Sequence, residues 1–107
     1  MTVYLCGPMA GQPNYGRDSF NFAEKTLRSK GWKVINPACL PTDLKQESYM
    51  PICLAMLREA DAVVTLHGWK KSDGACLEVR YADHLSIPVF PLQEAFRSGI
   101  EGENYGE

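Results

Sequence analysis

Apolar and polar residues alternate along this chain with two different periods. Short apolar runs at residues 3–6 and 62–66 have the length of buried strands. Elsewhere apolar residues recur at helical spacing, as Phe20, Ala23 and Leu27 do, and a glycine at position 31 is placed to end that helix. The pattern predicts strands at residues 3–6, 32–36, 61–66 and 87–90, and helices at residues 18–30, 48–60 and 74–85.

This alternation predicts one α/β domain over residues 1–97, with Ser48 capping the second helix. We expect a three-layer Rossmann/flavodoxin-like sandwich around a parallel four-stranded sheet of order 2-1-3-4, and Pro88 favours an edge position for the last strand. In that order the loops at residues 7–16 and 67–73 flank one crevice, at the topological switch point. Residues 98–107 are glycine-rich and acidic, which predicts a mobile tail.

A single carboxylate, Glu78, stands out in the helix that follows the third strand. Its neighbours three and four positions away are glycine, alanine and tyrosine, so none of them is a cation that could pair with it. It also lies beyond the capping-box position for either Ser72 or Asp73. These features favour a functional carboxylate, and the alternative is an ordinary solvated helix glutamate.

The start of the same helix is suited to an anion. Ser72 precedes Gly74 at the helix N-terminus, where free backbone N–H groups and the helix dipole attract phosphate. Ordinary N-capping by Ser72 and Asp73 is the alternative, and the two roles are compatible. The backbone of the first loop would complete this cradle, because glycine allows close approach of a ligand. The candidate phosphate-binding residues are Gly7, Met9, Ala10, Gly11, Arg17, Ser72 and Gly74, with Lys70 and Lys71 as further sources of charge.

Composition narrows the range of ligands. The 107 residues carry a net charge of -2, so there is no broad basic field for a nucleic acid polymer. The four cysteines lack CxxC spacing and only two histidines are present, so we expect no metal site and no other cofactor. Reduced thiols and the absence of a recognisable signal or membrane segment favour a cytoplasmic protein that does not bind membranes. A small anionic molecule remains the expected ligand.

Several common classes of protein with this α/β architecture do not fit the sequence. No Walker lysine follows a glycine loop, and the first loop lacks the GxGxxG pattern of dinucleotide sites. The third strand ends at Leu66 and His67, where a receiver domain would carry an acidic residue. No cysteine is followed six residues later by arginine, as phosphatases of that class require. Trp69 is a candidate for stacking on a base, although an aromatic residue after a strand more often covers the core edge.

At residues 3–92 the chain resembles the nucleoside 2-deoxyribosyltransferase superfamily, in particular short, functionally unassigned relatives close to its nucleoside 5'-monophosphate N-glycosidases. The resemblance rests on the opening VYLCGPMAG, on the strand DAVV that begins at Asp61, and on the Ser-x-Gly-x-x-x-Glu spacing from Ser72 to Glu78. It implies that Glu78 is a nucleophile that attacks the sugar, as in a retaining glycosidase. It also implies that Ser72 binds phosphate, because monophosphate hydrolases carry serine there and many free-nucleoside transferases carry an acid.

One position departs from that family. An aspartate expected eight residues before Asp61 is replaced by Cys53, and a thiol is a poorer acid than a carboxyl group. Either Asp43, Glu47 or Asp61 substitutes for it, or the site binds without efficient turnover. Two hypotheses therefore remain: an N-glycosidase or 2-deoxyribosyltransferase-like enzyme, and a non-catalytic module that binds or senses nucleotides.

The resemblance further implies a homodimer, because family members complete the site with a neighbouring subunit. The second helix has more apolar residues than one core-facing stripe requires, namely Met50, Ile52, Leu54, Met56 and Leu57.

Overall fold

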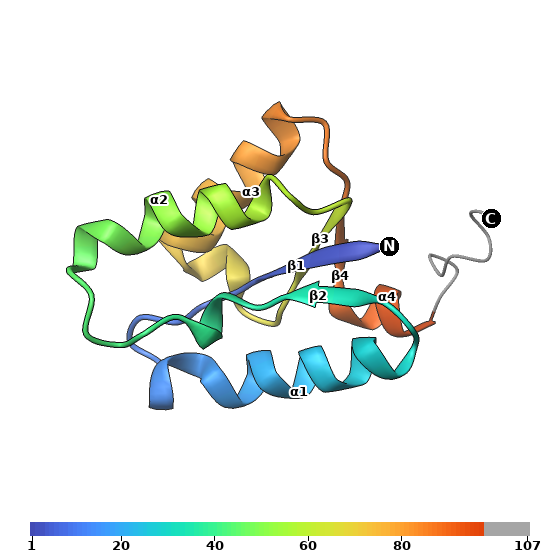
Figure 1. The fold of residues 1–107 in the computed structure, drawn as a ribbon, viewed down its shortest axis with the longest axis horizontal. Helices are drawn as coiled ribbons and strands as arrows, with labels where there is room; N and C mark the ends of the chain where they lie inside the picture. The colour runs from blue at the N-terminus through green and yellow to red at the C-terminus, as the bar shows by residue number, and fades with distance from the viewer. Residues whose placement is uncertain (98–107) are drawn as a thin grey trace.

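The centre of the computed structural model, which describes residues 1–97, is a sheet of four parallel strands in the order β2-β1-β3-β4 (Figure 1). Val3 pairs with Val34 of β2 on one side and with Ala62 of β3 on the other. The predicted α/β fold and strand order are confirmed. Strand β4 lies at the edge of the sheet, the position that Pro88 favoured. The strands are β1 (Thr2–Cys6), β2 (Lys33–Ile35), β3 (Ala62–Thr65) and β4 (Val89–Pro91).

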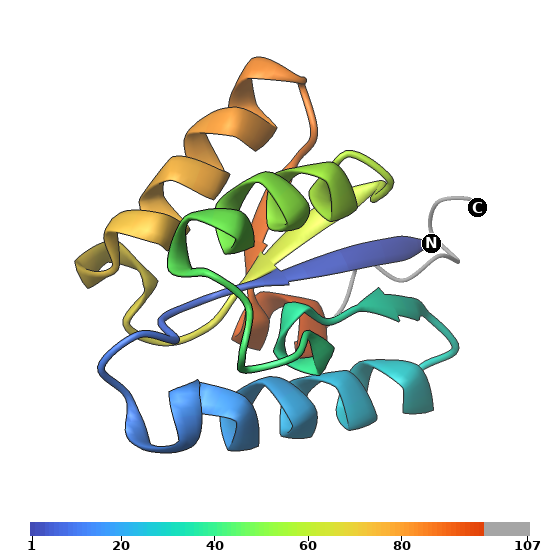
Figure 2. The ribbon, with the colours of Figure 1, turned by 60° about the vertical axis from the view of Figure 1, so that its left-hand side comes forward.

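Helices cover both faces of this sheet, as Figure 2 shows. Helices α1 and α4 pack on one face, and α2 and α3 pack on the other. Short 3-10 turns occupy three of the connections. The α-helices are α1 (Arg17–Ser29), α2 (Gln46–Leu57), α3 (Asp73–His84) and α4 (Leu92–Arg97), and the 3-10 turns are η1 (Pro13–Gly16), η2 (Pro37–Cys39) and η3 (Trp69–Lys71).

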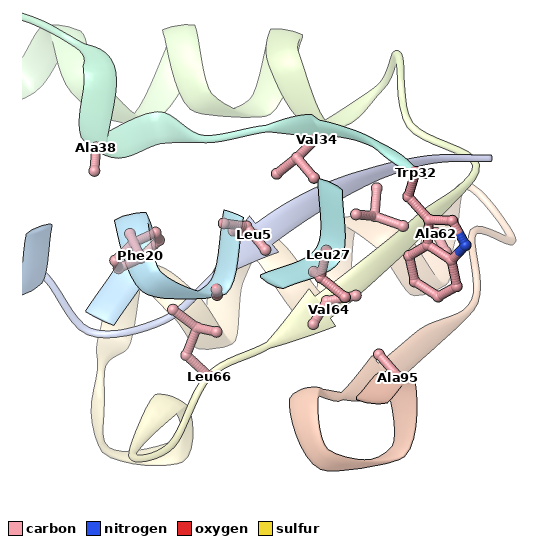
Figure 3. Close-up of a cluster of buried hydrophobic side chains, with 12 residues drawn as sticks. Leu5, Phe20, Leu27, Trp32, Val34, Ala38, Ala62, Val64, Leu66 and Ala95 are labelled. Atoms are coloured by element: carbon pink, nitrogen blue, oxygen red, sulfur yellow. The ribbon is translucent and has the colours of Figure 1, made fainter. Parts of the chain in front are cut away.

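The alternation of side chains along β1 divides the core into two clusters. Val3 and Leu5 point toward α1, and their cluster includes Leu27 of α1 and Ala95 of α4 (Figure 3). Tyr4 and Cys6 point to the opposite face, under α2 and α3. Each face of the central strand is thus buried, so a polar side chain on either face needs an internal partner.

Two local predictions are wrong. Ser48 does not cap α2, because the helix begins at Gln46 and the Ser48 N–H donates to the Lys45 carbonyl at 2.9 Å. The short helix α4 was not predicted, since six residues are too few to display a helical period and its burial comes from docking on the sheet. The tail predicted at residues 98–107 lies outside the described residues. Within residues 1–97, no helix has the length and apolar character needed to cross a membrane.

Candidate functional site

A pocket of about 260 Å³ opens at the carboxyl ends of the strands, in the crevice that the strand order predicted. The segments that follow β1, β2 and β3 all begin at this side of the sheet (Figures 1 and 2). Most of the predicted site residues come together there. Those that line the pocket are Gly7, Met9, Ala10, Arg17, Ser72, Gly74 and Glu78.

Glu78 is buried in the pocket wall with only 6% of its surface exposed. It shares the sheet-facing side of α3 with Ala75 and Ala82, whose small side chains leave room for it. Its Oε2 accepts a hydrogen bond of 2.8 Å from the Tyr4 hydroxyl, which reaches it from the middle of β1. The alternative of a solvated helix glutamate is therefore wrong, and Glu78 is a positioned carboxyl group.

Burial raises the pKa of Glu78 above its ordinary value, although the hydrogen bond from Tyr4 acts in the opposite direction. Within residues 1–97 no basic side chain forms an ion pair with it. Removal from water also raises the pKa of Tyr4 and of Cys6, and the nearby Glu78 charge raises both further. Both groups stay protonated at neutral pH. The Tyr4 hydroxyl donates to the Glu78 carboxyl group, and the Cys6 thiol donates to the Ala75 carbonyl at 3.4 Å.

Cys53 is a second inward-facing side chain of the pocket, contributed by α2. It is buried, and burial raises the pKa of its thiol, with the Glu78 charge raising it further. The position where the resemblance expects an aspartate therefore lies on the pocket, but a neutral thiol occupies it. Glu78 is the only acidic residue among the described residues that line the pocket.

The N-terminus of α3 forms the polar end of the pocket. Ser72 is the N-cap, and its Oγ accepts a hydrogen bond of 3.2 Å from the Ala75 N–H. The hydroxyl proton remains able to donate to a ligand, so capping and ligand binding are compatible. A side chain at Gly74 would place its Cβ 3.2 Å from the Met50 methyl group, so glycine keeps this part of the pocket open.

Arg17 supplies the positive charge of the pocket. It begins α1, and its Nη2 donates to the Leu40 carbonyl at 3.0 Å, which fixes the guanidinium group against the segment after β2. Its Nε is buried and has no acceptor among residues 1–97. A buried donor without a partner is costly, and a ligand oxygen could reach it only if the Arg17 side chain moved.

Seven candidate residues that the sequence analysis named do not line the pocket: Gly11, Asp43, Glu47, Asp61, Trp69, Lys70 and Lys71. Asp61 is a clear correction, because it precedes β3 and its Oδ2 accepts a hydrogen bond of 2.9 Å from the Thr2 N–H. That is the amino edge of the sheet, opposite to the pocket, so Asp61 cannot act as the acid. Trp69 packs against the core cluster under α2 and α3, with the Lys70 ammonium 5.8 Å from its ring centre.

Sequence analysis missed three features of the site. Tyr4 was assigned only to the core, although the period of two along β1 puts it on the side that α3 covers. Tyr15 was not considered, yet it lines the pocket. The segment after β2 forms an apolar wall of the pocket that includes Pro37, Leu40 and Pro41, which the sequence did not indicate. No local pattern marks that wall, because only the sheet order brings it beside α3.

The family model that matches residues 1–91 is described as a domain of unknown function, DUF4406. The chain belongs to the DUF4406 family. The matched range contains every residue that lines the pocket, so the pocket lies within the domain that this family shares. No curated protein matches the chain. The DUF4406 description assigns no activity, and function is therefore argued from the geometry and chemistry of the pocket.

Proposed function

We propose that this pocket binds a nucleoside or deoxynucleoside 5'-monophosphate and that Glu78 breaks its N-glycosidic bond. The observation that carries the proposal is one buried, positioned carboxyl group in the same pocket as Ser72, Gly74 and Arg17. Such a pocket suits a ligand that has an anionic group at one end and an electrophilic carbon a few bonds away. A sugar phosphate joined to a base is a ligand of this kind.

The phosphate is held at the N-terminus of α3 in this proposal. A helix of 12 residues presents free N–H groups and a partial positive charge there, and the Ser72 hydroxyl adds a donor. Arg17 lines the same pocket, and its guanidinium charge favours an anionic ligand. Because all these donors lie in one pocket, a free nucleoside would use fewer of them than a monophosphate.

The sugar lies against Glu78. Its ionised carboxylate attacks the anomeric carbon, the bond from that carbon to the base nitrogen breaks, and the base leaves with the bonding electrons and takes up a proton. A glycosyl ester on Glu78 remains, and water or a second base displaces the carboxylate from it. Tyr4 holds the carboxyl group in one orientation throughout, which favours attack over rotation of the side chain.

The resemblance to the nucleoside 2-deoxyribosyltransferase superfamily supports the same roles, because its motif assigns the nucleophile to Glu78 and the phosphate to Ser72. We place the activity in the cytoplasm, where the four free thiols would persist. The pocket residues form no metal cluster within the part of the chain that the structure describes, and the proposed displacement does not require one.

A second candidate function is nucleotide binding without turnover, as in a sensor. The observation that favours it is Cys53, because no carboxyl group other than Glu78 lines the described pocket to protonate the departing base. Loss of a general acid slows such chemistry by roughly two to four powers of ten and leaves binding intact. The two candidates share one ligand and differ only in whether the bond breaks.

Incubation with a panel of ribonucleoside and deoxynucleoside monophosphates tests both candidates. We expect chromatography to detect free base released by the wild-type protein and none above background with Glu78→Gln. Binding of a monophosphate without base release above that control would favour the binding module. If no nucleotide binds, measured by calorimetry at millimolar concentration, both candidates are wrong.

We also propose a homodimer formed through α2. Of the apolar residues on this helix, Met50 lines the pocket and Leu57 is in the core, whereas Ile52 and Leu54 remain half-buried on the helix surface. A second copy would cover them. We expect light scattering at micromolar concentration to give the mass of two chains, and Ile52→Glu to reduce it to one. A wild-type mass of one chain would contradict this proposal.

A further inference from the structure

The loop between β1 and α1 carries three successive residues in the left-handed backbone region. Asn14 has φ 53° and ψ 31°, Tyr15 has φ 55° and ψ 29°, and Gly16 has φ 71°. Glycine adopts this conformation without strain, but for a side chain as bulky as tyrosine it is unfavourable. A tyrosine held in this region needs an explanation from its surroundings.

The surroundings of the loop enforce this conformation. A Cβ atom at Gly16 would lie 2.6 Å from the Pro8 carbonyl oxygen, so the loop folds back onto the turn that follows β1. The Tyr15 N–H donates to the Gln12 carbonyl at 2.9 Å, and the Gln12 N–H donates to the Met9 carbonyl at 3.1 Å. The loop is thus closed by contacts among its own residues, and Met9, which accepts one of these hydrogen bonds, lines the pocket.

Tyr15 lines the pocket, and 54% of the residue is exposed. Arg17, two residues later, is bonded to the Leu40 carbonyl, so this loop and the apolar wall after β2 are joined on the same side of the pocket. A large exposed ring in an unfavourable conformation contributes little to the core, and its position suits contact with a ligand.

We infer that Tyr15 is the stacking platform for the base of the bound nucleotide, a role that sequence analysis considered only for Trp69. This inference rests on the proposed function. Stacking on one face of Tyr15 covers the exposed ring and leaves the deeper groups, Ser72 and Glu78, to the phosphate and the sugar. Because every base has an aromatic face, this contact strengthens binding of all bases and selects among them weakly.

The test compares ligands with and without a base. Calorimetry measures the affinity of each of the four deoxynucleoside monophosphates and of 2-deoxyribose 5-phosphate, in a Glu78→Gln background that prevents turnover. We expect Tyr15→Leu to weaken monophosphate binding by about ten-fold or more and to leave sugar phosphate binding unchanged. Tyr15→Phe keeps the ring and should retain the affinity. Phe22→Ala is the matched control, because Phe22 is 62% exposed on α1 and does not line the pocket.

Stability measurements separate stacking from collapse of the loop. Tyr15→Gly is expected to lose the same affinity while its Tm stays the same or rises, because glycine adopts the left-handed conformation without strain. Equal losses for both ligands, or full affinity of Tyr15→Leu, would overturn the role of Tyr15 and leave the nucleotide site intact. If the parent protein binds no monophosphate, the proposed function fails and the stacking role fails with it.

Discussion

Glu78→Gln should abolish base release, by at least about 10³-fold, while nucleotide binding persists. An amide has nearly the shape of the carboxyl group and its oxygen can still accept the Tyr4 hydrogen bond, but it cannot form the glycosyl ester. The measurements are single-turnover base release by chromatography and affinity by calorimetry. Glu47→Gln is the matched control, since Glu47 is an exposed acidic residue outside the pocket. Retention of most of the activity in Glu78→Gln would contradict the nucleophile assignment.

The raised pKa of Glu78 also predicts two dependences on pH. The nucleophile must be ionised, so activity should rise with pH through the pKa of Glu78 and level off above it. The stability of the fold depends on pH in the opposite direction and falls as pH rises. Because the folded-state pKa lies above the unfolded one, the stabilisation from the buried neutral acid is complete below the unfolded pKa and is lost as pH rises through the folded pKa.

Glu78→Gln removes this loss, so at pH 8 its Tm should exceed that of the wild type. The difference should shrink at pH 4, where both side chains are neutral. A lower Tm for Glu78→Gln at pH 8 would mean that the carboxylate is stabilised by interactions other than its hydrogen bond with Tyr4.

Cys53→Asp should increase base release, by about 10²- to 10⁴-fold if the missing acid limits the reaction. Cys53 lines the pocket, and its thiol is a neutral, weak acid because burial raises its pKa. An aspartate there would share a proton with Glu78, since two neighbouring carboxylates do not both ionise readily, and one of them would remain an acid at neutral pH. The gain should appear in the rate of base release at saturating monophosphate.

Cys53→Asn is the matched control, because it has the shape of aspartate without the acidic proton. Equal rates for the two variants would show that the acid is not what limits turnover. The substitution should also lower Tm, since a carboxyl group replaces a thiol at a buried position. If Cys53→Asp binds nucleotide but still releases no base, the site is better explained as a binding module.

The fold could largely be predicted because the hydrophobic patterns of its strands and helices are local and recur along the chain. Alternating periods of two and of about 3.6 residues indicated each long element, and the rules for parallel sheets then allowed few topologies. Glu78 and Ser72 could also be predicted as site residues from the sequence. The lack of a cationic partner for Glu78 and the capping position of Ser72 are both visible from residues within a few positions. The helix α4 and the start of α2 were missed, because docking on the sheet and backbone contacts determine them.

By itself, the sequence determined the parallel α/β sheet, the crevice at the carboxyl ends of its strands, and seven of the residues that line it. Only the tertiary structure decided which polar groups meet. Tyr4 and Glu78 are 74 residues apart and come within 2.8 Å because β1 lies beneath α3, and the same packing brings Cys53 to the pocket. It also assigned Asp61 to the far edge of the sheet. Contacts between distant segments depend on packing of whole elements, and no local period encodes them.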